Sequence, residues 1–184
     1  LQQTGTNLFS SITLFKNRWY DSIRVESYPT AANGILGKFE NTDENESWGL
    51  ELEVMGTWNR LRLDANASHI KSKNVDLDVA YEAFPDWMLN LGLGYQLSTQ
   101  WDLYILNRYQ HRRAASEPEY GVEPHLESDD FYRTDLTLSW IPAPNLVTRL
   151  AIRNLLDREN FMPGYSDRLA GSPDNGINGS LSVE

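Results

Sequence analysis

Apolar and polar residues alternate one by one along several stretches of the chain. In WMLNLGLGY, residues 87–95, every second residue is large and apolar, and the residues between are Met88, Asn90, Gly92 and Gly94. A period of two is typical of a β-strand with two different faces, because successive side chains point to opposite sides. The same pattern predicts strands at 48–58, 61–69, 101–109 and 132–140, and less regular ones at 10–25, 146–154 and 176–183.

These stretches make about eight strands, and no segment has the period of an amphipathic helix, so an all-β fold is predicted. The predicted connections alternate in length. Tight turns are expected at 59–60, 98–100 and 142–145, and long polar loops at roughly 26–47, 71–86, 111–130 and 155–175. Such a layout is typical of an antiparallel up-and-down transmembrane β-barrel. Residues 1–184 are expected to form a single barrel segment without a linker.

Aromatic residues stand at both ends of the apolar face in four of these strands. Trp48 and Trp58 lie ten residues apart. Ten residues of strand tilted near 45° rise roughly 23 Å, close to the ~25 Å apolar band of a membrane barrel. We therefore predict two rows of membrane-interface aromatics, one at the short turns and one at the long loops. The turn end holds Trp58, Tyr95, Trp101 and Trp140, and the loop end holds Trp48, Trp87, Tyr109 and Tyr132.

A soluble β-sandwich would also place aromatic residues at strand ends, because they are favourable strand residues. The opposite faces argue against it, since Arg, Asp and Glu stand there at strand centre, as in a wall that encloses water. On this interpretation Asn90, Gly92 and Gly94 face a wet interior. Their small size is expected to leave room for a plug or a solute.

Composition narrows the possible functions. The formal net charge is −10 and the pI about 4.7, which argues against a nucleic-acid partner. The chain has no cysteine, so disulfides and thiolate metal sites are excluded. Mean hydropathy is −0.52 and no window approaches eighteen apolar residues, so no transmembrane helix is expected. The start, LQQTGTNLF, has no signal-peptide pattern, which leaves a processed protein or an internal fragment.

Three stretches of the chain resemble the C-terminal barrel segment of a TonB-dependent outer-membrane receptor. WGLELEV, residues 48–54, is similar to the Gly-x-Glu strand that follows a polar loop in this family. LAIRNLLDRENF, residues 150–161, is similar to the penultimate strand ending in Asn-Leu-Phe-Asp, with Leu156 where Phe is usual. FPDWMLNLGLGY, in which Pro85 opens a strand, also fits. Together the stretches span most of the chain.

The resemblance implies an active importer in the cell outer membrane of a Gram-negative bacterium. It would take up a ferric siderophore, cobalamin or another scarce solute, powered by the inner-membrane TonB complex. The plug domain and the TonB-engaging segment are not found in this sequence, and the chain stops at Glu184 within the last expected strand. About eight strands would form only part of a ~22-stranded barrel, with two unpaired edges facing the rest of the wall.

Residues that carry catalytic or metal chemistry are not found in suitable patterns. The histidines, His69, His111 and His125, have no metal-ligand spacing, and neither DENES nor PDNGING has the glycine at the sixth position, followed by a glutamate, that a calcium loop requires. Neither a nucleophile elbow nor a nucleotide-binding glycine motif occurs. Glu51 and Glu53 share a face but are typical of a wall with charge partners across the sheet. We expect neither an enzyme nor a cofactor.

The candidates for ligand binding lie in the loop at 111–130. His111, Arg112 and Arg113 form the one dense basic cluster of an acidic chain, and Tyr120 and His125 follow it. Positive charge beside aromatic rings suits an anionic ferric chelate or a phosphate-bearing solute. Alternatively, the arginines pair with acidic residues of the same loop or with anionic outer-membrane lipid.

Two other functions remain open at this point. About eight strands can close into a small barrel by themselves, which would give a porin-like or structural outer-membrane protein. A soluble all-β carbohydrate-binding module is the more distant alternative.

Overall fold

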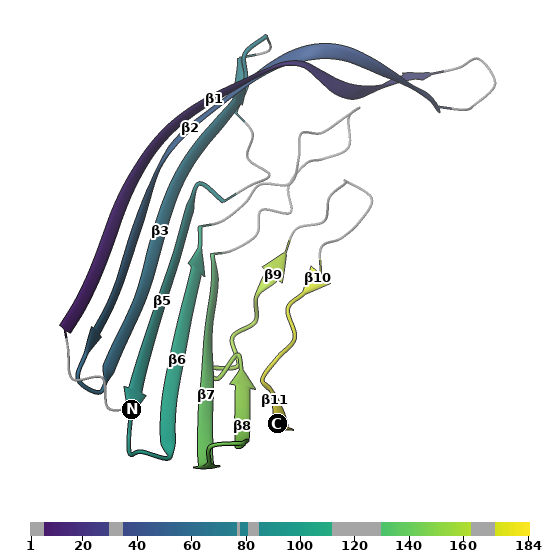
Figure 1. Cartoon of the computed structure of the whole chain (residues 1–184). Coiled ribbons are helices and arrows are strands. Elements are labelled where there is room, and N and C mark those ends of the chain that lie inside the picture. Colours follow the sequence, from purple (N-terminus) through teal and green to yellow (C-terminus); the bar gives the residue numbers. More distant parts are fainter. Residues whose placement is uncertain (1–5, 30–34, 77, 81–84, 112–129, 163–171) are drawn as a thin grey trace.

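Eight strands of the computed structural model form one antiparallel sheet (Figure 1). The structure describes residues 6–29, 35–76, 78–80, 85–111, 130–162 and 172–184. Along the sheet the strands are β1 (Thr6–Pro29), β2 (Ile35–Trp58), β3 (Leu61–Asn74), β5 (Trp87–Gln96), β6 (Trp101–Gln110), β7 (Phe131–Ala143), β8 (Leu146–Arg153) and β11 (Asn178–Val183). The short strand β4 (Val79–Ala80) pairs with β3, and β9 (Phe161–Met162) pairs with β10 (Ser172–Pro173). The predicted all-β meander of eight strands is confirmed.

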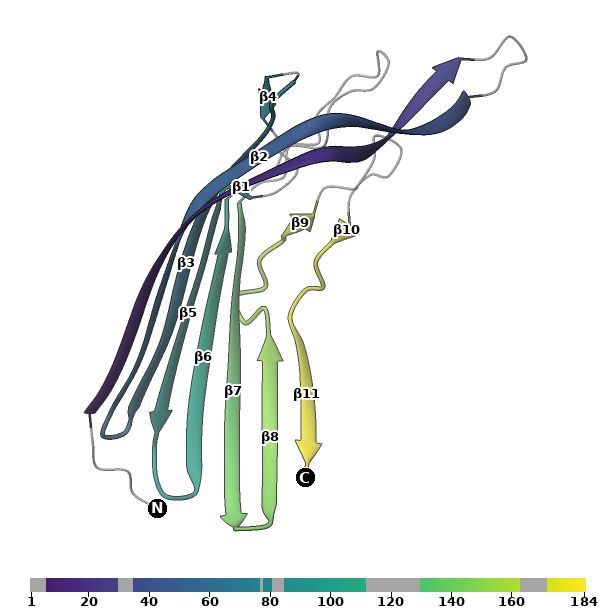
Figure 2. The same cartoon turned by 45° about the horizontal axis from the view of Figure 1, so that its top comes forward.

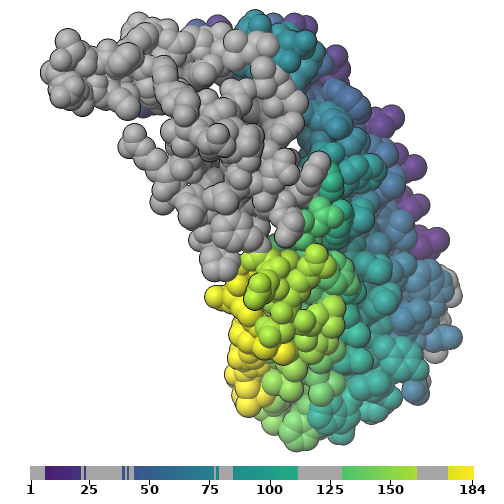
Figure 3. Space-filling view, turned by 180° about the vertical axis from the view of Figure 1, so that it is seen from behind, coloured from purple at the N-terminus to yellow at the C-terminus, as the bar shows by residue number. Residues whose placement is uncertain are grey.

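The sheet is an open, curved wall with β1 at one edge and β11 at the other (Figures 1 and 2). No backbone pairing joins these two strands in the part of the chain that the structure describes. The view from behind shows the sequence colours following one another across the wall (Figure 3). The self-closed barrel considered above therefore does not form, and the architecture is that of a wall segment.

The predicted tight turns are present at one end of the sheet. Residues 59 and 60 join β2 to β3, and Asn59 has a positive φ of 52°. Asn tolerates this left-handed conformation better than most residues because its short polar side chain bonds locally. Residues 97–100 join β5 to β6, and residues 144 and 145 join β7 to β8.

The loop predicted at 26–47 is largely wrong. Strands β1 and β2 each have 24 residues and pair as far as Pro29 and Ile35. They extend beyond the other strands and arch over (Figure 2), with a bulge where Asp21 has a φ of 55°. The polar sequence ENTDENES, residues 40–47, has no apolar face, so alternation does not mark it as a strand. Its backbone instead pairs with β1, and partly with β3.

The leucines of β5 lie on an exposed face. Leu89, Leu91 and Leu93 are 40–42% exposed, and all face the same side as Trp87 and Tyr95. We call this side of the sheet the apolar face and the opposite side the polar face. Among the described residues, Phe131 is the one buried hydrophobic side chain. A soluble sandwich would bury these leucines, so the sheet is not one half of such a core.

The glycines of β5 do not leave empty space on the polar face, contrary to the expectation from sequence. A Cβ atom on Gly92 would collide with the hydroxyl of Tyr104, and one on Gly94 would lie 2.8 Å from Nη2 of Arg62. The Arg62 guanidinium in turn lies 5.2 Å from the centre of the Tyr104 ring, a cation–π distance. The two glycines let these long side chains lie flat across the strand.

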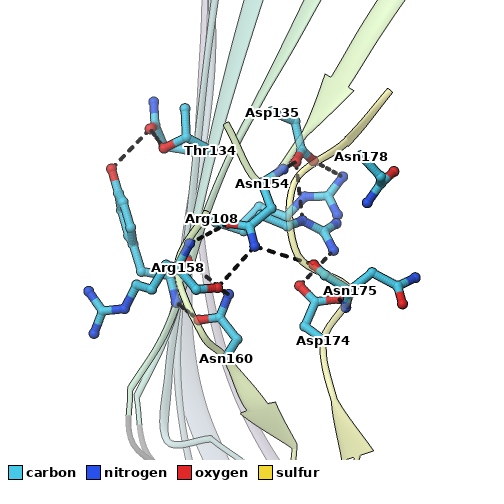
Figure 4. Close-up of polar contacts among 12 residues, drawn as sticks. Arg108, Thr134, Asp135, Asn154, Arg158, Asn160, Asp174, Asn175 and Asn178 are labelled. Carbon is cyan, nitrogen blue, oxygen red and sulfur yellow. Dashed lines mark hydrogen bonds and ion pairs between the residues drawn. The ribbon is translucent and has the colours of Figure 1, made fainter. Parts of the chain in front are cut away.

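After β8 the chain leaves the ladder, and side-chain amides take over the pairing with β7 (Figure 4). The carboxamide of Asn160 accepts a hydrogen bond from the Tyr132 N–H at 3.0 Å and donates one to the Tyr132 carbonyl at 3.1 Å. It thus satisfies two backbone groups that a neighbouring strand would satisfy. Asn154, 1% exposed, donates to the carbonyls of Arg158 and Asn175 at 2.9 and 3.3 Å. The family-like NLLD stretch begins with this residue.

Candidate functional site at the loop end of the sheet

The register of the strands places the predicted aromatic residues in two rows. At the turn end, Trp58 and Tyr95 both pair with Leu61, and Trp101 pairs with Trp140. The rings of Trp101 and Trp140 are stacked with centres 5.9 Å apart. We call the four predicted residues here, Trp58, Tyr95, Trp101 and Trp140, the turn row.

At the loop end, the predicted residues lie next to a histidine that the sequence interpretation left out. His69 stacks on Trp87 with ring centres 4.3 Å apart and meets Trp48 edge to face at 6.2 Å. Tyr109 pairs with Tyr132 further along the sheet. We call Trp48, His69, Trp87, Tyr109 and Tyr132 the loop row. Strand alternation offered a signal for His69, since it shares the face of Leu61, Leu63, Ala65 and Ala67.

Asp86 connects three strands at the loop row. Its carboxylate accepts a hydrogen bond from Nδ1 of His111 at 2.6 Å and lies 3.6 Å from Nζ of Lys71. Its backbone carbonyl accepts one from the Ile70 N–H and one from Nδ1 of His69, both at 2.9 Å. Because a carbonyl oxygen only accepts, Nδ1 of His69 carries the proton. The base of the loop that follows His111 is thereby anchored to β3 and β5.

The electrostatics of this anchor favour a charged Asp86. Burial on its own raises the pKa of the Asp86 carboxyl. The hydrogen bond with His111 and the charges of His111, Lys71 and His69 together outweigh burial, so the pKa lies below its ordinary value of 3.8. Asp86 is therefore an anion at neutral pH and contacts Lys71 and His111 in that form.

Of the predicted ligand-binding residues, the described part of the chain contains His111 alone. It follows β6 directly and lies opposite Trp87, on the apolar face, where its N–H donates to the Trp87 carbonyl at 2.9 Å. Arg112, Arg113, Tyr120 and His125 lie outside the described residues. Their role in binding stays a prediction.

The polar face carries networks of charged side chains. Arg62 lies 3.7 Å from Asp64 and 3.6 Å from Asp102. Further along, Arg133 lies 3.2 Å from Asp135 and 3.4 Å from Asp174. The Asp135 carboxylate also accepts a hydrogen bond from the Asn154 N–H at 3.0 Å (Figure 4). These pairs lie within β3, within β7, between β3 and β6, or between β7 and Asp174, and they place charge of both signs on the polar face. This face is therefore suited to contact with water or with polar groups of a partner.

Neither a membrane-spanning helix nor a metal centre is present in the described ranges. None of their residues forms a helix long and apolar enough to cross a membrane. They also contain no group of three or more His, Asp or Glu side chains placed to hold a metal ion.

The faces, rows and turns together define a class of protein. An antiparallel meander with an exposed apolar face, a charged opposite face and aromatic residues at both ends is the wall of a transmembrane β-barrel. The chain belongs to the TonB-dependent receptor family, because the family model described as TonB dependent receptor-like, beta-barrel matches residues 2–155. The resemblance seen in the sequence is thereby confirmed.

Solved structures with the same fold are receptors and transporters. The chain is similar to the ferric-catecholate import receptor Fiu from E. coli K12, with a TM-score of 0.75 and 14% identity, over 96% of this chain and 24% of Fiu. It is similar to the ferripyoverdine receptor of the outer membrane of Pseudomonas aeruginosa, with a TM-score of 0.73 and 16% identity, over 96% and 24%. The copper transporter OprC matches with a TM-score of 0.75 and 18% identity, over 96% and 28%.

The chain thus spans about a quarter of the length of these proteins. A comparison with curated protein sequences gave no match.

Proposed function

We propose that the chain forms part of the barrel of an active-transport receptor in the outer membrane of a Gram-negative bacterium. The observation that carries the proposal is an open sheet with one exposed apolar face and one charged face, in a chain of the TonB-dependent receptor family. On this proposal the apolar face contacts lipid tails, and the turn row and the loop row lie at the two membrane interfaces. A plug, the remaining strands and the segment that engages TonB belong to other parts of the receptor.

The solute class that we propose is a ferric siderophore or another chelated scarce metal. Three similar structures are of a ferric-catecholate receptor, a ferripyoverdine receptor and a copper transporter. Catecholate chelates of iron are anionic, and the basic sequence His111, Arg112 and Arg113 offers charge of the opposite sign. We propose no catalytic role and no resident cofactor for this chain.

In the proposed binding mode, the loop at 111–130 contacts the chelate. Arg112 and Arg113 supply positive charge, and Tyr120 and His125 supply ring contacts. The anchor at Asp86 supports this mode, because it ties His111 to β3 and β5 just before the two arginines. A loop with a fixed base loses less conformational entropy when it binds.

Uptake by whole cells tests this function. The complete receptor gene is expressed in a strain that lacks its own siderophore receptors, and uptake of a 55Fe–catecholate chelate is measured with and without a functional TonB complex. We expect uptake only when both the receptor and TonB are present. Uptake that persists without TonB would contradict the proposal.

A substitution in the loop tests the binding residues. The double change Arg112→Gln and Arg113→Gln is expected to raise the KM for uptake roughly tenfold or more with little effect on the maximal rate, because it removes charge from binding alone. The matched control Arg149→Gln and Arg153→Gln removes the same charge from the polar face of β8 and is expected to leave KM unchanged. A rise in KM that is equal in both variants would mean that the loop has no special role.

A further inference from the structure

Two Asn-Gly pairs follow each other closely in the stretch PDNGING. Asn175–Gly176 lies in the connection between β10 and β11, whereas Asn178–Gly179 begins β11. In such a pair the backbone nitrogen of the glycine can attack the side-chain carbonyl carbon of the asparagine, because glycine has no Cβ atom to hinder the approach. A third pair, at residues 33 and 34, lies outside the described residues. The same chemistry is thus offered in two different structural settings.

In the connection, the groups that would react are free. The Asn175 side chain is exposed, and neither it nor the Gly176 N–H makes a hydrogen bond to the described part of the chain. Figure 4 shows the Asn175 carboxamide pointing away from the marked contacts. Only its backbone is engaged, with the N–H donating to the Asp174 carboxylate at 3.0 Å and the carbonyl accepting from Nδ2 of Asn154 at 3.3 Å. Residues 174–176 belong to no strand, so the backbone there is not fixed by a ladder.

The second pair is restrained by the sheet. The backbone of Asn178 pairs with Arg153 of β8, and its Nδ2 donates to the Gly176 carbonyl at 3.0 Å. A strand residue has ψ near +135°. Closing a ring between the side chain of Asn178 and the next backbone nitrogen rotates ψ well away from that value. Such a rotation would break the pairing with Arg153, so the strand opposes the reaction at this position.

We propose that Asn175 is a site of spontaneous deamidation and that Asn178 is protected from it. The Gly176 nitrogen loses its proton to water and attacks Cγ of Asn175. A C–N bond forms, and the side-chain nitrogen leaves with that proton as ammonia. Water then adds to either carbonyl of the cyclic imide and opens the ring to an aspartate or an isoaspartate. The balance is water consumed and ammonia released, with no oxidant or reductant, and the proposal is independent of the membrane placement.

Both products alter the polar contacts beside β7. An aspartate at position 175 adds a negative charge next to Asp174, which lies 3.4 Å from Arg133. An isoaspartate adds a methylene group to the backbone and so displaces the carbonyl that accepts from Asn154. Because Asn154 is 1% exposed, the loss of that acceptor leaves a buried donor unpaired. The link between Asn154 and the connection is therefore expected to weaken as the receptor ages.

Isotope labelling of the complete receptor tests the proposal. The receptor is purified from membranes in detergent and incubated in 18O-labelled water, once folded and once in denaturant. Peptide mass spectrometry then measures the label incorporated at Asn175 and at Asn178 of the same molecules. In the folded receptor, conversion at Asn175 is expected to be roughly tenfold faster or more, because the strand must open before Asn178 reacts. In denaturant, the two rates are expected to agree within about threefold, because both asparagines precede glycine.

Two glycine variants give matched controls. Gly176→Ala places a methyl group beside the attacking nitrogen and is expected to slow conversion at Asn175 roughly tenfold, folded or in denaturant. The measurement in denaturant stays informative even if the new Cβ atom, 3.1 Å from Oδ1 of Asp157, disturbs the fold. Gly179→Ala is expected to leave the rate at Asn175 unchanged. Equal rates at Asn175 and Asn178 in the folded wild type overturn the proposal, as does conversion at Asn175 that Gly176→Ala does not slow.

Discussion

The two faces of this sheet differ in what covers their side chains. On the apolar face, leucines such as Leu91 and Leu93 remain two-fifths exposed, and in the described part of the chain β5 contacts its sheet neighbours β3 and β6. On the polar face, Tyr104 and Arg62 lie across glycines, and Arg133 bridges two aspartates. On the polar face, side chains of the protein therefore contact one another, whereas the exposed apolar face has to be covered by the surroundings. A lipid bilayer is the solvent in which the apolar face is stable.

This difference also explains how a sheet with almost no apolar core keeps its shape. In a soluble domain, burial of apolar area between layers supplies most of the stability. In this sheet, the backbone ladder and the side-chain contacts of the polar face fix the arrangement, and polar groups such as Asn154 and Asn160 complete the ladder where β8 ends. Substitutions on the two faces are therefore expected to lower the free energy of unfolding by different amounts and for different reasons.

The largest effect is expected when the same substitution is made on opposite faces of β6. Ile105 and Leu106 are adjacent and both half-buried, but Ile105 pairs with Leu93 on the apolar face and Leu106 pairs with Asp135 on the polar face. Ile105→Arg is expected to lower the free energy of unfolding in vesicles by about 2–4 kcal/mol, since it lies midway between Trp101 and Tyr109. Leu106→Arg is expected to lower it by less than about 1 kcal/mol, because on the polar face the new guanidinium would lie beside Asp135. Denaturant titration of the complete receptor in lipid vesicles measures both, and equal losses would contradict the assignment of the faces.

A slightly smaller loss of unfolding free energy is expected when the buried Asn154 is changed, because its amide lies beside β7 where a neighbouring strand would otherwise pair. In Asn154→Asp, a carboxylate oxygen replaces the Nδ2 group that donates to two backbone carbonyls. Leaving these buried groups unpaired is expected to cost about 2–3 kcal/mol of unfolding free energy. Asn178→Asp is the control, because Asn178 is exposed and donates to one carbonyl only. The same denaturant titration would contradict this role if the two variants were equally stable.

The strand glycines provide a third test, on the packing of the polar face. Gly92→Ala places a methyl group against Tyr104 and is expected to cost about 1–3 kcal/mol. Gly179→Ala is the control, because its nearest atom would be the Ala151 carbonyl oxygen at an ordinary 3.7 Å. In a background with Tyr104→Ala, the cost of Gly92→Ala is expected to disappear. A double-mutant cycle on the unfolding free energy measures this coupling, and a result near zero would show that Tyr104 does not restrict residue 92.

Whether a strand can be predicted from the sequence depends on whether local alternation or pairing with a distant strand determines it. The strands at 48–58 and 87–95 were predictable because a sheet with two different environments must alternate its side chains. The strand at residues 35–47 was missed for two reasons. Its pairing is made by backbone groups of β1, and the polar residues 40–47 do not alternate with apolar ones. The space expected beside Gly92 was wrong, because Tyr104 is supplied by another strand and the register decides which side chain lies there.

The loop-end site was predictable in part for similar reasons. Trp48 and Trp87 followed from alternation, and His69 follows from the same parity although it was left out. Asp86 gave no local signal, because its partners Lys71 and His111 are brought to it by the pairing of β3, β5 and β6. Charged contacts that join distant strands are visible once the register is known.

The smallest change in unfolding free energy is expected from titration of Asp86, whose carboxylate contacts Lys71 and His111 and so joins β3, β5 and β6. Because the folded pKa of Asp86 is depressed below 3.8, its contribution is present above that pH and is lost as the pH falls through the folded pKa. Asp86→Asn is therefore expected to cost about 1 kcal/mol at pH 7, and this cost is expected to disappear as the pH falls below 3.8 and through the lower folded pKa. Asp78→Asn is the control, since Asp78 is 88% exposed and 3.5 Å from Lys73, and is expected to cost close to zero throughout the titration. A cost of Asp86→Asn that stayed constant throughout the acid titration would mean that the side chain acts through packing, and that charge does not hold the base of the loop.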